Sequence, residues 1–202
     1  MPSTSTSLYL TDAPMRQRLN IDDDTFVFGS IGSLIPRKAT TTRWRLWHSS
    51  ARNIPRRNGK WCWSGEGAER RALTEQARAL GIESRVIFTG FQNTPFDYLA
   101  TFDAFILASK SEGLPRVVLE AMLLNIPVIG SQVTGTAELI DHDSTGLLFP
   151  WSDVSQLAQH LDNIWADAEL RARLAAAAYQ NVCHTYAIEN YVSGVEAVLG
   201  AH

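Results

Sequence analysis

Short apolar segments alternate with amphipathic ones along most of this 202-residue chain, and this alternation limits the possible folds more than any other feature. Each apolar segment is only a few residues long and is bounded by glycine, proline or polar residues. Strands are expected within residues 26–32, 84–91, 103–109, 127–131 and 146–150. Because strands that alternate with helices form a parallel sheet covered on both faces, the predicted class is α/β with a doubly wound sheet.

Helices are expected between these strands and after the last one. The clearest lies within 66–81, where Leu73, Ala77 and Leu80 share one face and Gly81 is a suitable C-terminal cap. The other expected helices are 15–21, 94–102, 115–125, 135–143, 153–166, 168–183 and 188–199. Residues 1–24 are interpreted as a polar lead-in and 25–200 as one domain.

Composition excludes several classes of protein. A net charge of −3 and an isoelectric point near 5.9 provide no basic field for nucleic acid. Neither the two cysteines, Cys62 and Cys183, nor the five histidines have the spacing of metal ligands, so no metal is predicted. No apolar run approaches the roughly 18 residues of a membrane helix, and the first residues do not form a convincing signal peptide. A cytoplasmic domain is expected.

Ligands of a parallel sheet bind beyond the carboxyl ends of its strands. Three segments with polar or small residues follow expected strands directly. They are GSLIPRK at 32–38, SEGLPRVVLEAM at 111–122 and VTGTAEL at 133–139. The candidate site therefore lies where these three segments meet.

The segment 111–122 is the most informative of the three. Pro115 suits the first turn of a helix, which makes Glu112, Gly113 and Leu114 the loop before a helix N-terminus, a natural seat for phosphate. Glu120 lies among apolar residues of that helix, where a ribose would give its carboxylate two charge-assisted hydrogen bonds. The alternative is an ordinary loop carboxylate and a helical glutamate that turns to solvent.

These residues also carry a resemblance to a known family. Glu112 and Glu120, with Gly113 after the first, resemble the two-glutamate motif of family-4 retaining glycosyltransferases of GT-B fold. GEGAERRALTEQARALGIESRVIFTGF and the block from FDAFILASKSEG to STGLLFP are similar to the motifs of the same family in the same order. The likeness spans residues 16–38 and 65–195. It implies the C-terminal, donor-binding domain, a Rossmann-like half of the GT-B fold.

The resemblance implies a role for each candidate residue. Glu112 would be the catalytic residue beside the transferred sugar, and Glu120 would bind the donor ribose. The remaining donor-binding residues would be Ser33, Lys38, Thr89, Phe91, Gly113, Leu114, Thr134 and Gly135. Among these, Lys38 would neutralise the diphosphate and the turn 89–91 would border the base. Ser33 departs from the family, which commonly has an arginine there; Arg37 or Arg116 could supply the second cation.

The resemblance also implies the reaction and its partners. The donor would be a nucleotide-diphosphate sugar, and neither a cofactor nor a divalent metal is implied, since Lys38 and the helix N-terminus would take the charge. The acceptor, a sugar or lipid-linked glycan, would bind an N-terminal domain that this sequence lacks, so the chain alone is expected to be inactive. Membrane association would be peripheral at most. The alternatives are an inactive nucleotide-sugar-binding fragment and a GT-B relative such as an epimerase.

Residues 39–64 fit neither the helical nor the strand period. They hold four of the six tryptophans, Trp44, Trp47, Trp61 and Trp63, beside many arginines. Tryptophans in such company are predicted to be exposed or irregularly packed.

The composition of 39–64 resembles GC-rich DNA read out of frame. Reading from the third base of each codon permits glycine after Lys38 and then an Ala/Leu-rich helix. It converts residues 60–64 into Met/Val-Val-Leu-Val, a strand before Gly65. We therefore hypothesise paired frameshifts around this segment, the alternative being a genuine insertion.

Overall fold

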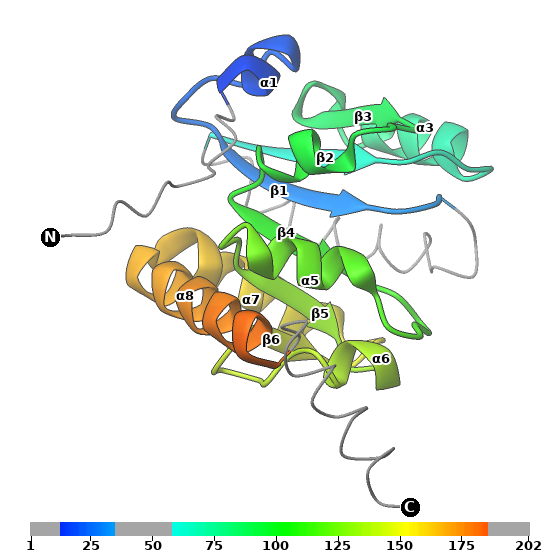
Figure 1. Cartoon of the computed structure of the whole chain (residues 1–202). Helices are drawn as coiled ribbons and strands as arrows, with labels where there is room; N and C mark the ends of the chain where they lie inside the picture. Colours follow the sequence, from blue (N-terminus) through cyan, green and yellow to red (C-terminus); the bar gives the residue numbers. More distant parts are fainter. Residues whose placement is uncertain (1–12, 35–57, 186–202) are drawn as a thin grey trace, which may run out of the picture.

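A computed structural model describes residues 13–34 and 58–185 of the chain. Its centre is a sheet of six parallel strands in the order β3-β2-β1-β4-β5-β6 (Figure 1). The strands are β1 (Phe26–Ile31), β2 (Gly59–Ser64), β3 (Val86–Gly90), β4 (Ala104–Leu107), β5 (Val128–Ser131) and β6 (Leu147–Phe149). The strand order changes direction between β1 and β4, which confirms the predicted doubly wound sheet and places its topological switch point there.

Helices cover both faces of this sheet. They are α1 (Ala13–Arg18), α3 (Arg70–Ala79), α4 (Pro95–Leu99), α5 (Arg116–Leu123), α6 (Thr134–Ala137), α7 (Val154–Ala166) and α8 (Ala168–Thr185), with a 3-10 turn η3 (Glu83–Arg85) before β3. The helix expected at 135–143 is only the four-residue α6. The helix expected at 188–199 lies outside the described residues.

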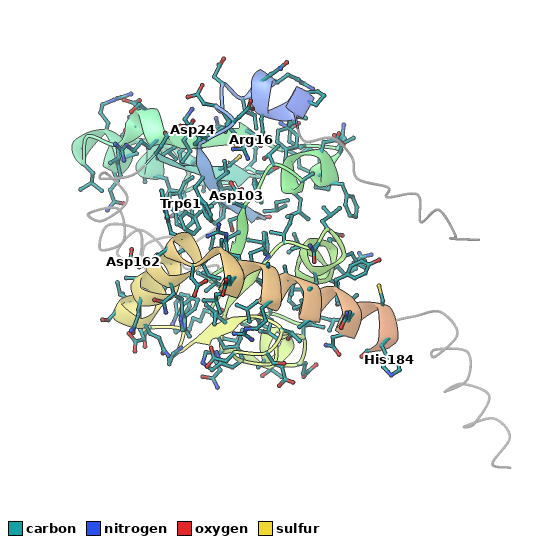
Figure 2. The ribbon with its side chains drawn as sticks, turned by 90° about the vertical axis from the view of Figure 1, so that its left-hand side faces the viewer. Arg16, Asp24, Trp61, Asp103, Asp162 and His184 are labelled. Atoms are coloured by element: carbon teal, nitrogen blue, oxygen red, sulfur yellow. The ribbon has the colours of Figure 1, made fainter. Side chains whose placement is uncertain are left out.

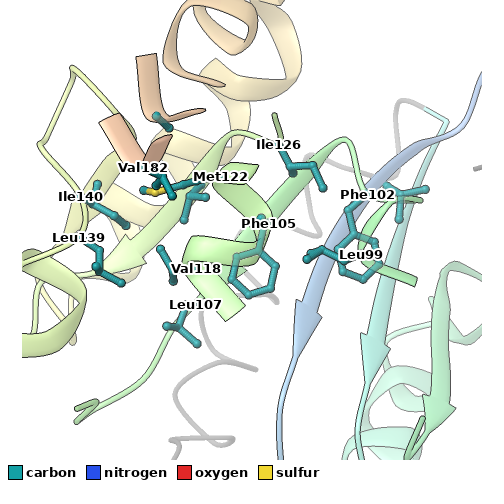
Figure 3. Close-up of a cluster of buried hydrophobic side chains, with 14 of the residues drawn as sticks. Leu99, Phe102, Phe105, Leu107, Val118, Met122, Ile126, Leu139, Ile140 and Val182 are labelled. Carbon is teal, nitrogen blue, oxygen red and sulfur yellow. The ribbon is translucent and has the colours of Figure 1, made fainter. Parts of the chain in front are cut away.

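Neighbouring residues of each strand point to opposite faces and build two layers of core. Phe105, Val118 and Met122 belong to the cluster under α4, α5 and α8 (Figure 3). Phe28 and Ile106 belong to the opposite cluster under α7. The apolar runs of the sequence are therefore explained by strands that are buried on both faces.

The predicted cap of α3 is present. Gly81 has a φ of 69°, and its N–H donates to the Arg78 carbonyl while the Ile82 N–H donates to the Ala77 carbonyl. This pair of bonds is the Schellman arrangement, which needs a residue in the left-handed region and so favours glycine. Leu73 and Ala77 are buried as expected and pack with Leu34.

The prediction that residues 39–64 form no regular element is wrong for the part that the structure describes. Residues 59–64 form β2, which pairs with β1 in unbroken register from Phe26–Gly59 to Ile31–Ser64 and with β3 on its other side. Trp61 is half-buried and stacks on Phe28 at 5.6 Å between ring centroids (Figure 2). The aromatic side chains fit because they share one face of a regular strand. Trp44 and Trp47 lie outside the described residues.

The amino edge of the sheet is held by a buried arginine. Arg16 in α1 donates to the carbonyls of Thr101 and Thr25 and lies 3.5 Å from a carboxylate oxygen of Asp103 (Figure 2). Burial raises the pKa of Asp103, although the Val27 N–H and Arg16 partly offset this. These contacts stabilise the amino ends of the strands, whereas the candidate site lies at their carboxyl ends. In the part of the chain that the structure covers, no helix is long and apolar enough to cross a membrane.

Candidate functional site

The loop between β4 and α5 carries the two glutamates that the sequence singled out. Glu112 is half-buried, and Gly113 and Leu114 are exposed, Leu114 by 52%. Helix α5 begins at Arg116, so Pro115 is its extended N-cap residue and not part of its first turn, one position from the prediction. In the described part of the chain, the backbone N–H groups of Gly113 and Leu114 donate to no other group. They are therefore available to an anion in front of a helix N-terminus.

Glu120 lies on α5 between its buried and exposed faces. Val118, Ala121 and Met122 are buried in the core, and Glu120 is half-buried beside them. Its carboxylate makes no hydrogen bond or ion pair to another described residue. A partly desolvated carboxylate gains most from a ligand that brings hydroxyl donors, as the ribose assignment requires.

The turn between β5 and α6 lies directly against the Glu112 loop. A methyl group built on Gly135 would stand 1.1 Å from the Gly113 carbonyl oxygen and 3.0 Å from that of Glu112. Only a residue without a side chain allows the two backbones to approach so closely. The structure thus brings the predicted residues Gly135 and Gly113 together, with Thr134 exposed at the start of α6.

Ser131, which the sequence analysis did not select, joins the same two segments at their bases. It is the last residue of β5, and its Oγ accepts from the Ser109 N–H at 3.0 Å and donates to the Ser109 carbonyl at 2.6 Å. Both serines are fully buried. The sequence shows that a serine ends the apolar strand in PVIGS, but it does not show its partner, because the partner belongs to the segment that follows β4.

The loop after β1 carries Ser33, which is exposed. The indole N–H of Trp63 donates to the carbonyl of the preceding residue, Gly32, at 2.9 Å. Trp63 therefore supports this loop and is not irregularly packed, a further correction to the prediction. Lys38 lies outside the described residues, as does Arg37.

Of the predicted turn 89–91, Thr89 and Gly90 are the last residues of β3, and Phe91 follows them at the same edge of the sheet. Gly90 has a φ of 76°, and its carbonyl accepts from the Gly65 N–H at 2.8 Å and from the Thr89 hydroxyl at 3.2 Å. Phe91 is 74% exposed, so its ring is open to a planar ligand. The described residues contain no cluster of three or more His, Cys, Asp or Glu side chains that could hold a metal ion.

The candidate residues therefore form two groups at one edge of the sheet. Backbone contacts join the turns after β1, β2 and β3, and a second set joins the turns after β4 and β5. The switch point between β1 and β4 separates the groups, which is where an open α/β sheet binds its ligands. A sequence family model described as Glycosyl transferases group 1 matches residues 12–181. The chain belongs to this family.

Curated relatives align with most of this chain. The lipopolysaccharide core biosynthesis glycosyltransferase LpsE of Rhizobium meliloti is 29% identical over 175 residues, which are 86% of this chain and 49% of LpsE. N-acetyl-alpha-D-glucosaminyl L-malate synthase of Bacillus anthracis is 33% identical over 134 residues, 66% of this chain and 35% of that enzyme. The chain thus spans about half the length, or less, of these relatives.

Solved structures agree on the fold. Anabaena Alr3699/HepE, solved in complex with UDP, superposes with a TM-score of 0.83 at 24% identity, covering 95% of this chain and 52% of that one. The C-terminal domain of LpcC, a glycosyl transferase group 1 family protein from Francisella tularensis, superposes with a TM-score of 0.72 at 25% identity. That match covers 81% of this chain and 87% of the LpcC domain.

Proposed function

We propose that this chain is the donor-binding half of a retaining glycosyltransferase that takes its sugar from a nucleotide-diphosphate sugar. One observation carries the proposal: the Glu112–Leu114 loop presents two unengaged backbone N–H groups in front of α5, and the half-buried Glu120 lies on that helix. A phosphate and a ribose are the two parts of a nucleotide that such groups recognise. The match of the chain to a C-terminal glycosyl transferase domain supports the same conclusion.

In this proposal the chain's residues act on successive parts of the donor. Glu120 accepts hydrogen bonds from the ribose hydroxyls, and Thr89 and Phe91 border the base. Gly113 and Leu114 donate backbone N–H bonds to the diphosphate, and Glu112 lies beside the sugar. Ser33, Thr134 and Gly135 complete the edge of the pocket.

Transfer breaks the bond between the anomeric carbon and the diphosphate oxygen and forms a bond from that carbon to an acceptor hydroxyl oxygen, whose proton is released. Negative charge therefore grows on the departing diphosphate. Stabilising that charge is the main contribution a protein can make to this step. The backbone N–H groups and Lys38 supply that stabilisation in this proposal, and no cofactor is part of it. Arg116, the exposed first residue of α5, is a further cation at the same helix terminus.

The proposal extends to the partners of the reaction. The acceptor, a sugar or lipid-linked glycan, binds a second domain that faces this edge of the sheet. Positioning two substrates requires both sides of the cleft, so transfer depends on the donor-binding half and this second domain together. We place the reaction in the cytoplasm, with at most peripheral contact to the membrane. The UDP bound to Alr3699/HepE makes UDP the first ligand to test.

Calorimetry with UDP, GDP and the matching nucleosides tests the proposal. One of the two diphosphates should bind more tightly than its nucleoside, and Lys38→Ala should remove most of that difference. Lys60→Ala is the matched control, because Lys60 contacts the Asn20 carbonyl at the opposite edge of the sheet. Equal loss of nucleoside and diphosphate binding in Lys38→Ala would show that the lysine acts through folding.

A further inference from the structure

The loop that carries Glu112 is fixed by the neighbouring turn at two separate points. At its base, Ser131 makes two hydrogen bonds with Ser109, three residues before Glu112. At its tip, Gly135 lies against the carbonyl of Gly113. Both contacts come from residues 131–135, the end of β5 and the start of α6, which we call the 131–135 clamp.

At the base of the clamp, a side-chain hydroxyl takes the place of the backbone pairing between β4 and β5. The register of β4 with β5 ends at the pair Leu107–Gly130. Beyond that pair, the Ser131 hydroxyl accepts from the Ser109 N–H and donates to the Ser109 carbonyl, as a backbone partner would. It also lies 3.3 Å from the Leu107 carbonyl. One buried hydroxyl therefore sets the point at which the chain leaves β4 and begins the loop.

The burial of this contact makes it sensitive to substitution. Ser131 and Ser109 are both 0% exposed, so water cannot replace a lost hydroxyl without entering the core. Removing Ser131 Oγ would leave the Ser109 N–H and carbonyl buried without their present partner, which is costly for backbone groups. The loop would then relax away from the position in which Gly113 and Leu114 present their N–H groups.

We infer that Ser131 is a positioning residue for donor binding, which it serves by holding the Glu112–Leu114 loop against the 131–135 turn. The inference rests on the proposed function, because the loop's task is to seat the diphosphate. Ser131 itself touches no ligand. Its loss should weaken binding of the diphosphate more than binding of the nucleoside, since the base and ribose contacts lie elsewhere.

Two buried serines allow a matched experiment. Ser30 in β1 donates its hydroxyl to the Ile106 carbonyl of β4 at 2.8 Å and is 1% exposed, but it holds no loop of the candidate site. Ser30→Ala and Ser131→Ala each remove one buried hydroxyl that bridges to β4 or its extension. Both should lower thermal stability. Only Ser131→Ala should lower UDP affinity, by about tenfold, the equivalent of one good hydrogen bond.

Hydrogen–deuterium exchange of the segment 109–114 provides a readout that does not depend on a ligand. Exchange there should be faster in Ser131→Ala than in the wild type or Ser30→Ala, and Ser131→Thr, which keeps the hydroxyl, should restore it together with UDP affinity. Unchanged loop exchange and UDP affinity in Ser131→Ala, with weakened binding in Glu120→Gln, would overturn the inference and leave the proposed function standing. A wild type that binds neither UDP nor GDP would overturn the proposed function, and loop exchange would still decide whether the clamp exists.

Discussion

Gly135 lies so close to Gly113 that a single added methyl group would stand 1.1 Å from the Gly113 carbonyl oxygen. This contact joins the two turns on which the candidate site depends. Neither residue has a positive φ, so the requirement for glycine at 135 comes from space alone. A methyl group on Gly113, by contrast, would meet nothing within 4 Å.

The first prediction compares alanine at these two glycines. Gly135→Ala should lower the free energy of unfolding by about 1–3 kcal/mol, because one of the two backbones has to move. Gly113→Ala should change it by less than about 0.5 kcal/mol. Urea unfolding without ligand measures both. Equal stability of the two variants would show that the turns are not in contact.

The second prediction concerns pH and two histidines that bracket Leu148 on the edge strand β6. His142 Nδ1 accepts from the Leu148 N–H at 2.9 Å, and the ring of His160 contacts the Leu148 carbonyl at 3.1 Å. Burial lowers the pKa of His160, an effect that the Leu148 contact only partly offsets. The unfolded chain then binds more protons than the folded one between that lowered pKa and the ordinary value near 6.5. Stability should therefore fall as pH drops through this window.

Urea midpoints at pH 7.5 and 5.5 check this prediction. His160→Gln keeps a donor for the Leu148 carbonyl and removes the titration, so its midpoint should depend less on pH than that of the wild type. His184→Gln, the same change at an exposed position, should keep the wild-type dependence. A wild type that gains stability on acidification would contradict the assigned direction.

Much of this fold follows from the sequence, because strands buried on both faces leave apolar runs that few other structures produce. β2 escaped prediction for a local reason. The many tryptophans and arginines of residues 39–64 conceal the strand alternation of Lys60–Ser64. There, Trp61 and Trp63 face one side of the sheet and Cys62 faces the other. The groups that they contact are the Phe28 ring of β1 and the Gly32 carbonyl in the loop after β1, and neither can be located from the segment itself.

The candidate site, like the fold, could be predicted from the sequence only in part. Glu112 and Gly135 follow the ends of β4 and β5, as the sequence predicts, because a motif fixes its residues relative to a strand end. The Ser131–Ser109 contact joins the end of β5 to the segment after β4, and these are neighbours only in the folded sheet. Sequence spacing contains no information on such a pair.

The third prediction is that Trp61 stabilises the sheet. Trp61→Ala should reduce the free energy of unfolding by somewhat less than the roughly 3–5 kcal/mol of a fully buried aromatic residue, since Trp61 is half-buried. Phe91→Ala, at a position exposed by 74%, should change stability little. Chemical unfolding followed by fluorescence and circular dichroism compares them. A negligible effect of Trp61→Ala would contradict this and favour the expectation that the tryptophan is irregularly packed.

The fourth prediction concerns the frameshift hypothesis. A chain restored to the alternative frame throughout 39–64 should unfold at a higher temperature, because an Ala/Leu-rich amphipathic helix can bury more apolar surface than an arginine-rich segment. Changing only Trp61–Trp63 to Val-Leu-Val should not raise the unfolding temperature, since β2 already pairs along its whole length and the change removes the Trp61 stacking and the Trp63 hydrogen bond. The coding DNA should show two compensating shifts at the ends of the segment. An equal melting temperature for the full correction would favour a genuine insertion.

The fifth prediction tests the central claim, that Glu120 holds the ribose of a nucleotide donor. Glu120→Gln keeps the shape of the side chain but replaces charge-assisted hydrogen bonds with neutral ones, so UDP or GDP affinity should fall by about 1.5–3 kcal/mol. Glu169→Gln, the same change at an exposed position of α8, should leave affinity unchanged. The deciding measurement is the calorimetric titration of the wild type and both variants with the diphosphate that the wild type binds. A weaker Kd in Glu120→Gln alone is the predicted result, and an unchanged Kd in that variant would contradict the ribose assignment.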